Sequence, residues 1–110
     1  SCVALRVLLP AWRRLLLGAG AEALVLVKPQ FEVGRDRVGR GGVVRDPAAH
    51  CDAIEMVITA AEALDWHAQG LVASPITGPA GNHEYVLWLG ANRTELGFDL
   101  QRLVNTTLQS

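Results

Sequence analysis

The sequence predicts an α/β fold in which the last strand runs antiparallel to the strands before it. Segments with strand character alternate with a long segment of helical periodicity, which is typical of helices packed on a mainly parallel sheet. A continuous apolar run over residues 24–27 indicates a strand buried on both faces. Only the short link 75–82 separates the last two strands, whereas a parallel crossover needs about a dozen residues or more. If those two strands pair directly, the last one must therefore be antiparallel.

The first predicted element is a helix over residues 3–17, where apolar side chains recur at helical spacing. Pro10 is the residue that fits this helix least well. Charges interrupt the run, and no basic region precedes it, so we expect neither a membrane span, which needs roughly 20 apolar residues, nor a signal peptide. The strand over 24–27 follows and ends at Lys28.

The next elements are a glycine- and arginine-rich loop over residues 30–45 and a second helix. Asp46 suits the N-cap of that helix and Pro47 its first turn, and the apolar stripe behind them ends near Trp66. Beyond it the sequence predicts three further elements, which are a strand over 71–74, a strand over 85–89 and a weak helix over 98–108. Trp12, Trp66 and Trp88 are expected to be packing residues.

Composition limits the classes of function. The chain has 110 residues, which suits one small domain, and half of them are hydrophobic. A net charge of -1 gives no general attraction to nucleic acid, so any RNA contact must come from a local patch. The two cysteines and three histidines lack metal-ligand spacing, and we expect reduced thiols and no metal site. The start at Ser1, without a methionine, suits a fragment of a longer protein.

Lys28 and Glu84 are the candidate catalytic pair. Lys28 follows the first strand directly, and an antiparallel last strand would begin near Glu84 at the same edge of the sheet. An amine and a carboxylate in one crevice suit a reaction in which a hydroxyl loses its proton, because the cation stabilises the alkoxide. The pattern alone leaves other interpretations open, namely a solvated lysine, an ordinary polar glutamate, or Glu32 as the carboxylate partner of the lysine.

Four motifs together resemble one family, and they lie at residues 28–34, 39–47, 74–79 and 81–89. The chain is similar from residue 1 to about residue 89 to the TlyA family, also called hemolysin A or FtsJ-like. Its members are ribosomal RNA (cytidine) 2'-O-methyltransferases that use S-adenosylmethionine. The resemblance implies that residues 1–90 are the C-terminal part of a methyltransferase domain, that is, of a Rossmann-like sheet with a final antiparallel strand. Residues 91–110 would then be a C-terminal tail.

The same resemblance implies the roles of individual residues. Lys28 matches the second lysine, and Glu84 the glutamate, of a Lys-Asp-Lys-Glu set. The aspartate, the first lysine, the glycine-rich cofactor loop and an RNA-binding domain all belong upstream of Ser1 in the family. The resemblance therefore implies no cofactor-binding residue within this chain, no activity of the chain alone, and a missing N-terminal half as its partner. It also implies a cytoplasmic protein that acts on ribosomal RNA or a ribosomal subunit.

Five residues are candidates for RNA contact. Phe31 could stack on the target base, although a phenylalanine next to a sheet is more often part of the core. The loop arginines could bind phosphates, or could simply be solvated, and they are Arg35, Arg37, Arg40 and Arg45.

Two other classes of function compete with the enzyme. One is a non-catalytic RNA-binding module on the same fold, which an intact upstream aspartate and cofactor loop would argue against. The other is a membrane-lytic protein, which the sequence disfavours because it has no span of suitable length and no strongly basic amphipathic helix. If the chain is a fragment, we also expect it to expose a sheet edge and an apolar face, and to self-associate when expressed alone.

Overall fold

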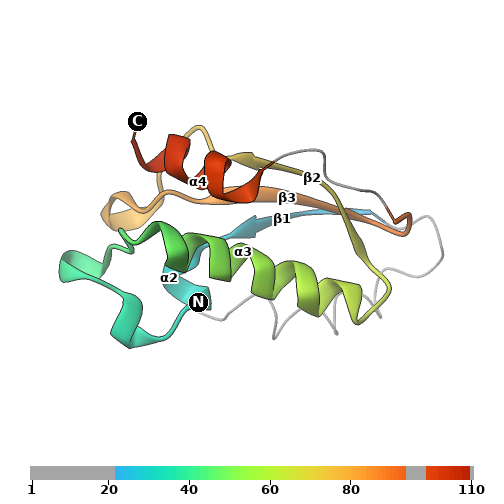
Figure 1. Cartoon of the computed structure of the whole chain (residues 1–110), viewed down its shortest axis with the longest axis horizontal. Coiled ribbons are helices and arrows are strands. Elements are labelled where there is room, and N and C mark those ends of the chain that lie inside the picture. Colours follow the sequence, from blue (N-terminus) through green and yellow to red (C-terminus); the bar gives the residue numbers. More distant parts are fainter. Residues whose placement is uncertain (1–21, 94–98, 110) are drawn as a thin grey trace.

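The computed structural model describes residues 22–93 and 99–109, and the helix expected over residues 3–17 lies outside this part of the chain. One layer is a three-stranded sheet, and helices α3 and α4 lie side by side on one of its faces (Figure 1). Three short 3-10 turns lie in the loops, at Arg35–Arg37, Arg40–Gly42 and Pro79–Gly81. The helices and strands are β1 (Ala23–Val27), α2 (Pro29–Glu32), α3 (Pro47–Glu62), β2 (His67–Ala73), β3 (Tyr85–Gly90) and α4 (Leu100–Leu108).

The sheet has the order β1-β3-β2, and β3 is antiparallel to both of its neighbours. The predicted antiparallel last strand is therefore confirmed. The expected mainly parallel sheet is not what the described residues form, because β1 and β2 run in the same direction but are separated by β3. Tyr85 at the start of β3 is in register with Val27 of β1 and with Ala73 of β2. The ends of β1 and β2 and the start of β3 consequently lie at one edge of the sheet.

Burial of the sheet is one-sided. Val25 and Val27 of β1 are buried beneath the helices, whereas Leu24 is 72% exposed and Leu26 is 37% exposed on the opposite face. The prediction that this strand is buried on both faces is therefore wrong for the described chain, because the described helices cover only one face of the sheet. Trp88 pairs with Leu24 across the sheet and is 42% exposed, so its expected packing role is also wrong.

Helix α3 provides most of the cover. The Asp46 side chain caps its first turn by accepting a hydrogen bond from the backbone N–H of Ala48 at 3.0 Å. The helix ends at Glu62, earlier than expected, and the chain reverses through Asp65, whose φ is positive at 58°. Trp66 then donates its backbone N–H to the Ala61 carbonyl and is fully buried, as predicted for a packing residue. The buried face of α3 consists of Ala49, His50, Ala53, Ile54, Val57 and Ala61.

Helix α4 lies where the weak helical pattern was predicted. The Asp99 carboxylate accepts a hydrogen bond from the backbone N–H of Arg102 at its start. Val104 and Thr107 are buried, and the helix packs against α3 and β2. No helix in residues 22–93 and 99–109 is long and apolar enough to cross a membrane.

Candidate functional site

The candidate site lies at the edge where β1 and β2 end and β3 begins. Because Val27 and Tyr85 are register partners, Lys28 and Glu84 are the next residues of neighbouring strands. The Ser74 backbone N–H donates to the Glu84 carbonyl at 2.8 Å and closes the edge on the β2 side. Residues from three separate stretches of the sequence are thus brought together here.

Lys28 is the N-cap of α2 and is partly buried. Its carbonyl accepts hydrogen bonds from the backbone N–H groups of Phe31 at 2.9 Å and Glu32 at 3.2 Å. Its ammonium lies 5.6 Å from the centre of the Phe31 ring, within the range of a cation–π contact. Lys28 and Phe31, two candidates from the sequence, are therefore direct neighbours.

The Glu84 side chain is only 4% exposed, which is unusual for a carboxylate. It accepts a hydrogen bond from the Gln30 side-chain amide, whose Nε2 lies 2.9 Å from Oε2. The carboxylate also lies against Gly78, where an added methyl group would come within 2.6 Å of the Glu84 carboxyl carbon. Within the described part of the chain, no ion pair joins the carboxylate to the Lys28 ammonium. The fold brings the two backbones together, and the two side chains contact different neighbours.

Glu32, the alternative carboxylate, ends the short helix α2 and is 3% exposed. Gln30 and Gly78, which contact Glu84 directly, were not candidates from the sequence. No local pattern could have singled out the glutamine, since its contact with Glu84 spans 54 positions.

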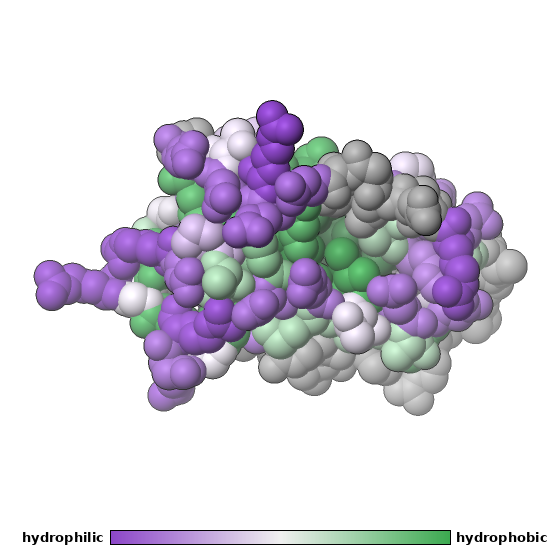
Figure 2. All heavy atoms as spheres, viewed as in Figure 1, coloured by the Kyte–Doolittle hydropathy of each residue, from purple (hydrophilic) through white to green (hydrophobic). Residues whose placement is uncertain are grey.

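The loop arginines differ in what they contact. Arg37 donates to Asp52 of α3 at 2.6 Å and lies 4.0 Å from Asp46, and the hydrogen bond to Asp52 raises the pKa of Arg37 above its ordinary value. Arg45 donates to the Arg40 carbonyl at 3.1 Å and closes the loop on itself. In Figure 2, hydrophilic residues gather at the end of the molecule where this loop lies. Of the four arginines, Arg37 is thus the one already held by carboxylates.

Asn82 fastens the arginine loop to the site. Its side chain is 2% exposed, accepts a hydrogen bond from the Val44 N–H at 3.0 Å, and donates to the Gly42 carbonyl at 2.8 Å. Asn82 lies in the link 75–82 and was not a candidate from the sequence, because an exposed turn asparagine and a buried one look alike in a sequence. It stands two positions from Glu84, so the loop and the carboxylate share one support.

His50 supports the same region from beneath. Its Nε2 lies 2.8 Å from the Val44 carbonyl, which can only accept, so Nε2 carries the proton and Nδ1 accepts from the Tyr85 hydroxyl at 2.8 Å. Burial lowers the pKa of His50, while the bond to Val44 opposes that shift. Burial likewise raises the pKa of Tyr85 well above its usual range. Both groups are therefore neutral at ordinary pH.

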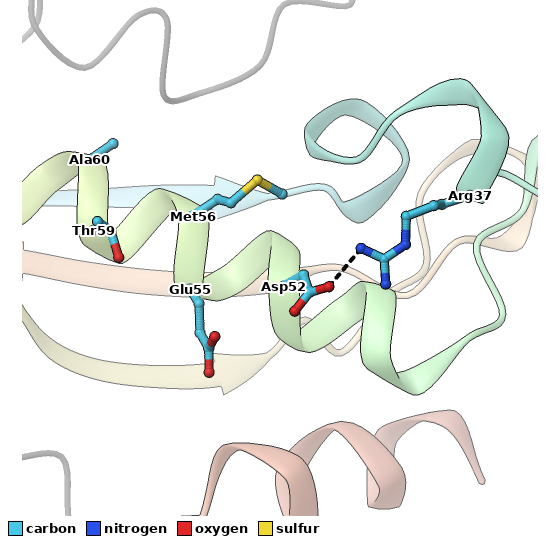
Figure 3. Close-up of a pocket in the computed structure, with 6 residues that line it drawn as sticks. All are labelled: Arg37, Asp52, Glu55, Met56, Thr59 and Ala60. Atoms are coloured by element: carbon cyan, nitrogen blue, oxygen red, sulfur yellow. Dashed lines mark hydrogen bonds and ion pairs between the residues drawn. The ribbon is translucent and has the colours of Figure 1, made fainter.

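Two surface depressions lie near these elements. One, of about 540 Å³, is an open hollow on α3 bounded by Arg37, Asp52 and Met56, and it includes neither Lys28 nor Glu84 (Figure 3). A second, of about 430 Å³, is lined by residues of the link after β2 and by α4. The described residues contain no cluster of three histidine, cysteine or acidic side chains suited to a metal ion.

The glycines of the arginine loop do not form a cradle for a nucleotide-like cofactor. A Cβ at Gly39 would lie 2.8 Å from the Val43 carbonyl and 2.9 Å from the Arg45 guanidinium, so the chain itself fills that space. Gly41 and Gly42 instead serve the backbone, with φ values of 74° and 79° that favour glycine. Of these three glycines, Gly39 is thus packed against the chain itself, and Gly41 and Gly42 shape the turn.

Comparison with known proteins identifies the family of this chain. Residues 6–91 match the sequence model of the FtsJ-like methyltransferase family. The chain is 47% identical over 92 residues to the 16S/23S rRNA (cytidine-2'-O)-methyltransferase TlyA of Mycobacterium tuberculosis, covering 81% of this chain and 33% of that protein. It is 46% identical over 89 residues to the "Putative rRNA methyltransferase YqxC" of Bacillus subtilis, covering 81% and 31%. The chain thus spans about a third of the length of these relatives.

Two solved structures are similar over nearly the whole chain. One is described as a putative hemolysin from Lactococcus lactis, with a TM-score of 0.85 and 35% identity, covering 96% of this chain and 51% of that one. The other, a putative hemolysin from Streptococcus thermophilus, has a TM-score of 0.86 and 31% identity, covering 99% and 40%. Sequence and structure agree, and the chain belongs to the FtsJ-like methyltransferase family, with TlyA-like rRNA methyltransferases among its relatives.

Proposed function

We propose that this chain supplies the hydroxyl-activating side of an S-adenosylmethionine-dependent rRNA (cytidine) 2'-O-methyltransferase. The main support is the register that puts Lys28 and Glu84 at one edge of the sheet, together with the reaction named for the TlyA relative. The proposal includes an upstream segment with the aspartate, the first lysine and the cofactor loop. The complete protein is this chain joined to that segment. The chain alone is expected to be inactive.

The proposed chemistry takes place at the ribose hydroxyl. Bound S-adenosylmethionine would supply the methyl group, whose bond to the sulfonium sulfur would break, leaving a neutral thioether, as its bond to the ribose oxygen forms. The hydroxyl proton would pass to solvent water. The Lys28 ammonium, beside the Phe31 ring, stabilises the negative charge that develops on that oxygen. Buried Glu84 fixes the direction from which the ribose and the amine approach. In this proposal Lys28 and Glu84 are the catalytic residues of the chain.

The RNA contacts are proposed for the surface beside this edge. Phe31 would stack on the target base, and the exposed Arg35, Arg40 and Arg45 would bind phosphates. Arg37 was a candidate as well, but its salt bridge to Asp52 makes support of the loop its better proposed role. The partner would be ribosomal RNA or a ribosomal subunit, encountered in the cytoplasm.

The test is methyl transfer from labelled S-adenosylmethionine to ribosomal RNA by the complete protein. The wild type is compared with Lys28→Met, which keeps the aliphatic stem on Phe31 and removes only the charge. We expect label at alkali-resistant linkages with the wild type, and a rate lower by about 100-fold or more in the variant. Arg102→Met, at an exposed position of α4, is the matched control and should leave the rate unchanged.

Two outcomes would contradict the proposal in different ways. Equal rates for the wild type and a folded Lys28→Met protein would remove the lysine from the mechanism. Binding of RNA without methyl transfer by any variant would instead indicate a non-catalytic RNA-binding module on the same fold.

A further inference from the structure

Gln30 has the most direct side-chain contact with the buried carboxylate at this edge. It belongs to the first turn of α2, two residues after Lys28, and its Nε2 donates to Glu84 at 2.9 Å. This orientation of the amide is the favourable one, because the amide oxygen in its place would put two acceptor oxygens against each other. Gln30 therefore connects helix α2, which follows Lys28, to Glu84, which directly precedes β3.

The oxygen of the Gln30 amide has different surroundings from its nitrogen. Its Oε1 is buried and accepts no hydrogen bond from any part of the chain that the structure describes. A buried acceptor without a donor costs about 1–3 kcal/mol, so an ordinary structural glutamine would be expected to satisfy it. The Gln30 amide is thus held on Glu84 even though its Oε1 has no donor among the described residues.

The Glu84 carboxylate depends on a neighbouring side chain to fix its orientation. Gly78 leaves room for the carboxylate but makes no hydrogen bond to it, and the side chain is 4% exposed, so water provides little support. A carboxylate can orient a ribose or an amine only if its own rotamer is fixed. Among the described residues, Gln30 is the side chain that donates to it.

We propose that Gln30 is a positioning residue for the methyl-transfer reaction, which locks the Glu84 carboxylate through its side-chain amide. This inference rests on the proposed function and deepens it. Gln30 acts through Glu84, so its removal should matter only while that carboxylate is present.

The experiment is a double-mutant cycle in the complete protein, with steady-state kinetics on ribosomal RNA. Gln30→Met keeps the length of the side chain and removes both the donor and the acceptor. We expect kcat to fall by about 10- to 100-fold, with KM for S-adenosylmethionine within about twofold of the wild-type value. Combined with Glu84→Gln, the same change should add less than about twofold to the loss that Glu84→Gln causes alone. The matched control, Gln101→Met at an exposed position of α4, should behave as the wild type.

Each result separates this inference from the proposed function. Suppose that the wild type is active and that Glu84→Gln lowers its rate. A normal kcat for Gln30→Met, or losses that multiply in the double variant, would then overturn the role of Gln30 and leave the proposed function standing. If the wild type transfers no methyl group, the proposed function fails, and the same cycle read on thermal unfolding midpoints still tests the contact. Coupled midpoints would support the Gln30–Glu84 lock, and additive midpoints would reject it. Gln30→Leu, which cannot form a hydrogen bond and adds no charge, replaces Gln30→Met if that variant does not fold.

Discussion

At the scale of single residues, the site depends on small or neutral neighbours placed around one buried carboxylate. Gly78 contributes by its missing side chain, since a methyl group there would overlap the Glu84 carboxylate. His50 and Tyr85 contribute through a neutral pair whose hydrogen bonds tie α3 to the first residue of β3. Neither contribution involves a charged group, and each can be tested by a single substitution.

Gly78→Ala should displace the Glu84 carboxylate. Overpacking of this kind costs about 1–3 kcal/mol, and the moved carboxylate should lower kcat in the complete protein as well. Urea unfolding and methyl-transfer rates measure the two effects. Gly70→Ala is the matched control, because a Cβ there would meet only the Trp88 ring at an ordinary 3.7 Å. Equal behaviour of the two variants would argue that the link moves freely away from Glu84.

His50 should make the protein acid-sensitive. Burial lowers its folded-state pKa below the ordinary 6.5, so the unfolded chain takes up a proton that the folded protein does not. The free energy of unfolding from this residue should thus be unchanged above about pH 6.5 and should fall as the pH drops further. His83 opposes protonation of His50 and Asp46 favours it, and both are smaller influences than burial.

The measurement is the thermal midpoint of the complete protein at pH 7.5 and pH 5.5. His50→Gln should start from a lower midpoint and should lose less of it on acidification than the wild type loses. His83→Gln should keep a loss close to that of the wild type. The same acid-induced loss in His50→Gln as in the wild type would show that other groups dominate the acid response.

At the scale of elements, the arginine loop and the strand that bears Glu84 are fastened to one another by a side chain and not by a sheet. Asn82 satisfies both the Val44 N–H and the Gly42 carbonyl, and the salt bridge from Arg37 to Asp52 holds the other end of the loop to α3. These polar contacts act together with Val33 and Val44, which lie in the hydrophobic core, and with Val38, which packs against it. Such contacts can order a phosphate-binding surface without a hydrophobic core of its own.

Asn82→Ala should release the loop. The Val44 N–H loses its acceptor, and its hydrogen exchange in the complete protein should become faster, with a stability cost of about 1–3 kcal/mol. Asn82→Asp keeps the acceptor and loses the donor to Gly42, so Val44 should stay protected while the loop near Gly42 loosens. RNA affinity should fall in both variants if the loop binds phosphates. Unchanged exchange at Val44 in Asn82→Ala would contradict the role given to this side chain.

At the scale of the whole molecule, the sheet is covered by α3 and α4 on one face and presents large apolar side chains on the other. Leu24, Leu26, Val72 and Trp88 are between 37% and 72% exposed there. In the described sheet, β1 and β2 are also both edge strands, with backbone groups free to pair. An apolar face next to open edges is a surface that other protein is expected to cover.

The chain expressed alone should therefore self-associate. We expect light scattering after size exclusion to report species larger than a monomer, and an apolar dye to bind. Trp88→Lys combined with Leu24→Lys should shift the chain toward the monomer, whereas lysine at exposed Gln101 and Gln109 of the α4 region should not. A monodisperse monomer with a sharp thermal transition would contradict this expectation.

The sequence was enough to predict the order of β1, α3, β2, β3 and α4, the antiparallel direction of β3 and the proximity of Lys28 to Glu84, although helix α2 lies largely in a segment predicted as a loop. These follow from local signals: a short link cannot make a parallel crossover, and a strand end places its next residue at the sheet edge. The Asp46 cap and the burial of Trp66 could be predicted in the same way, because each depends on residues close in the chain.

Only the tertiary structure decided what the side chains contact. The bond from Gln30 to Glu84 spans 54 positions, and the bonds of Asn82 to the arginine loop span about 40, so no local pattern encodes them. One-sided burial of β1 was equally invisible, because an apolar run looks the same whether helices cover one face of the described sheet or both. Periodicity and turn chemistry act over a few residues, whereas these contacts depend on how separate elements pack.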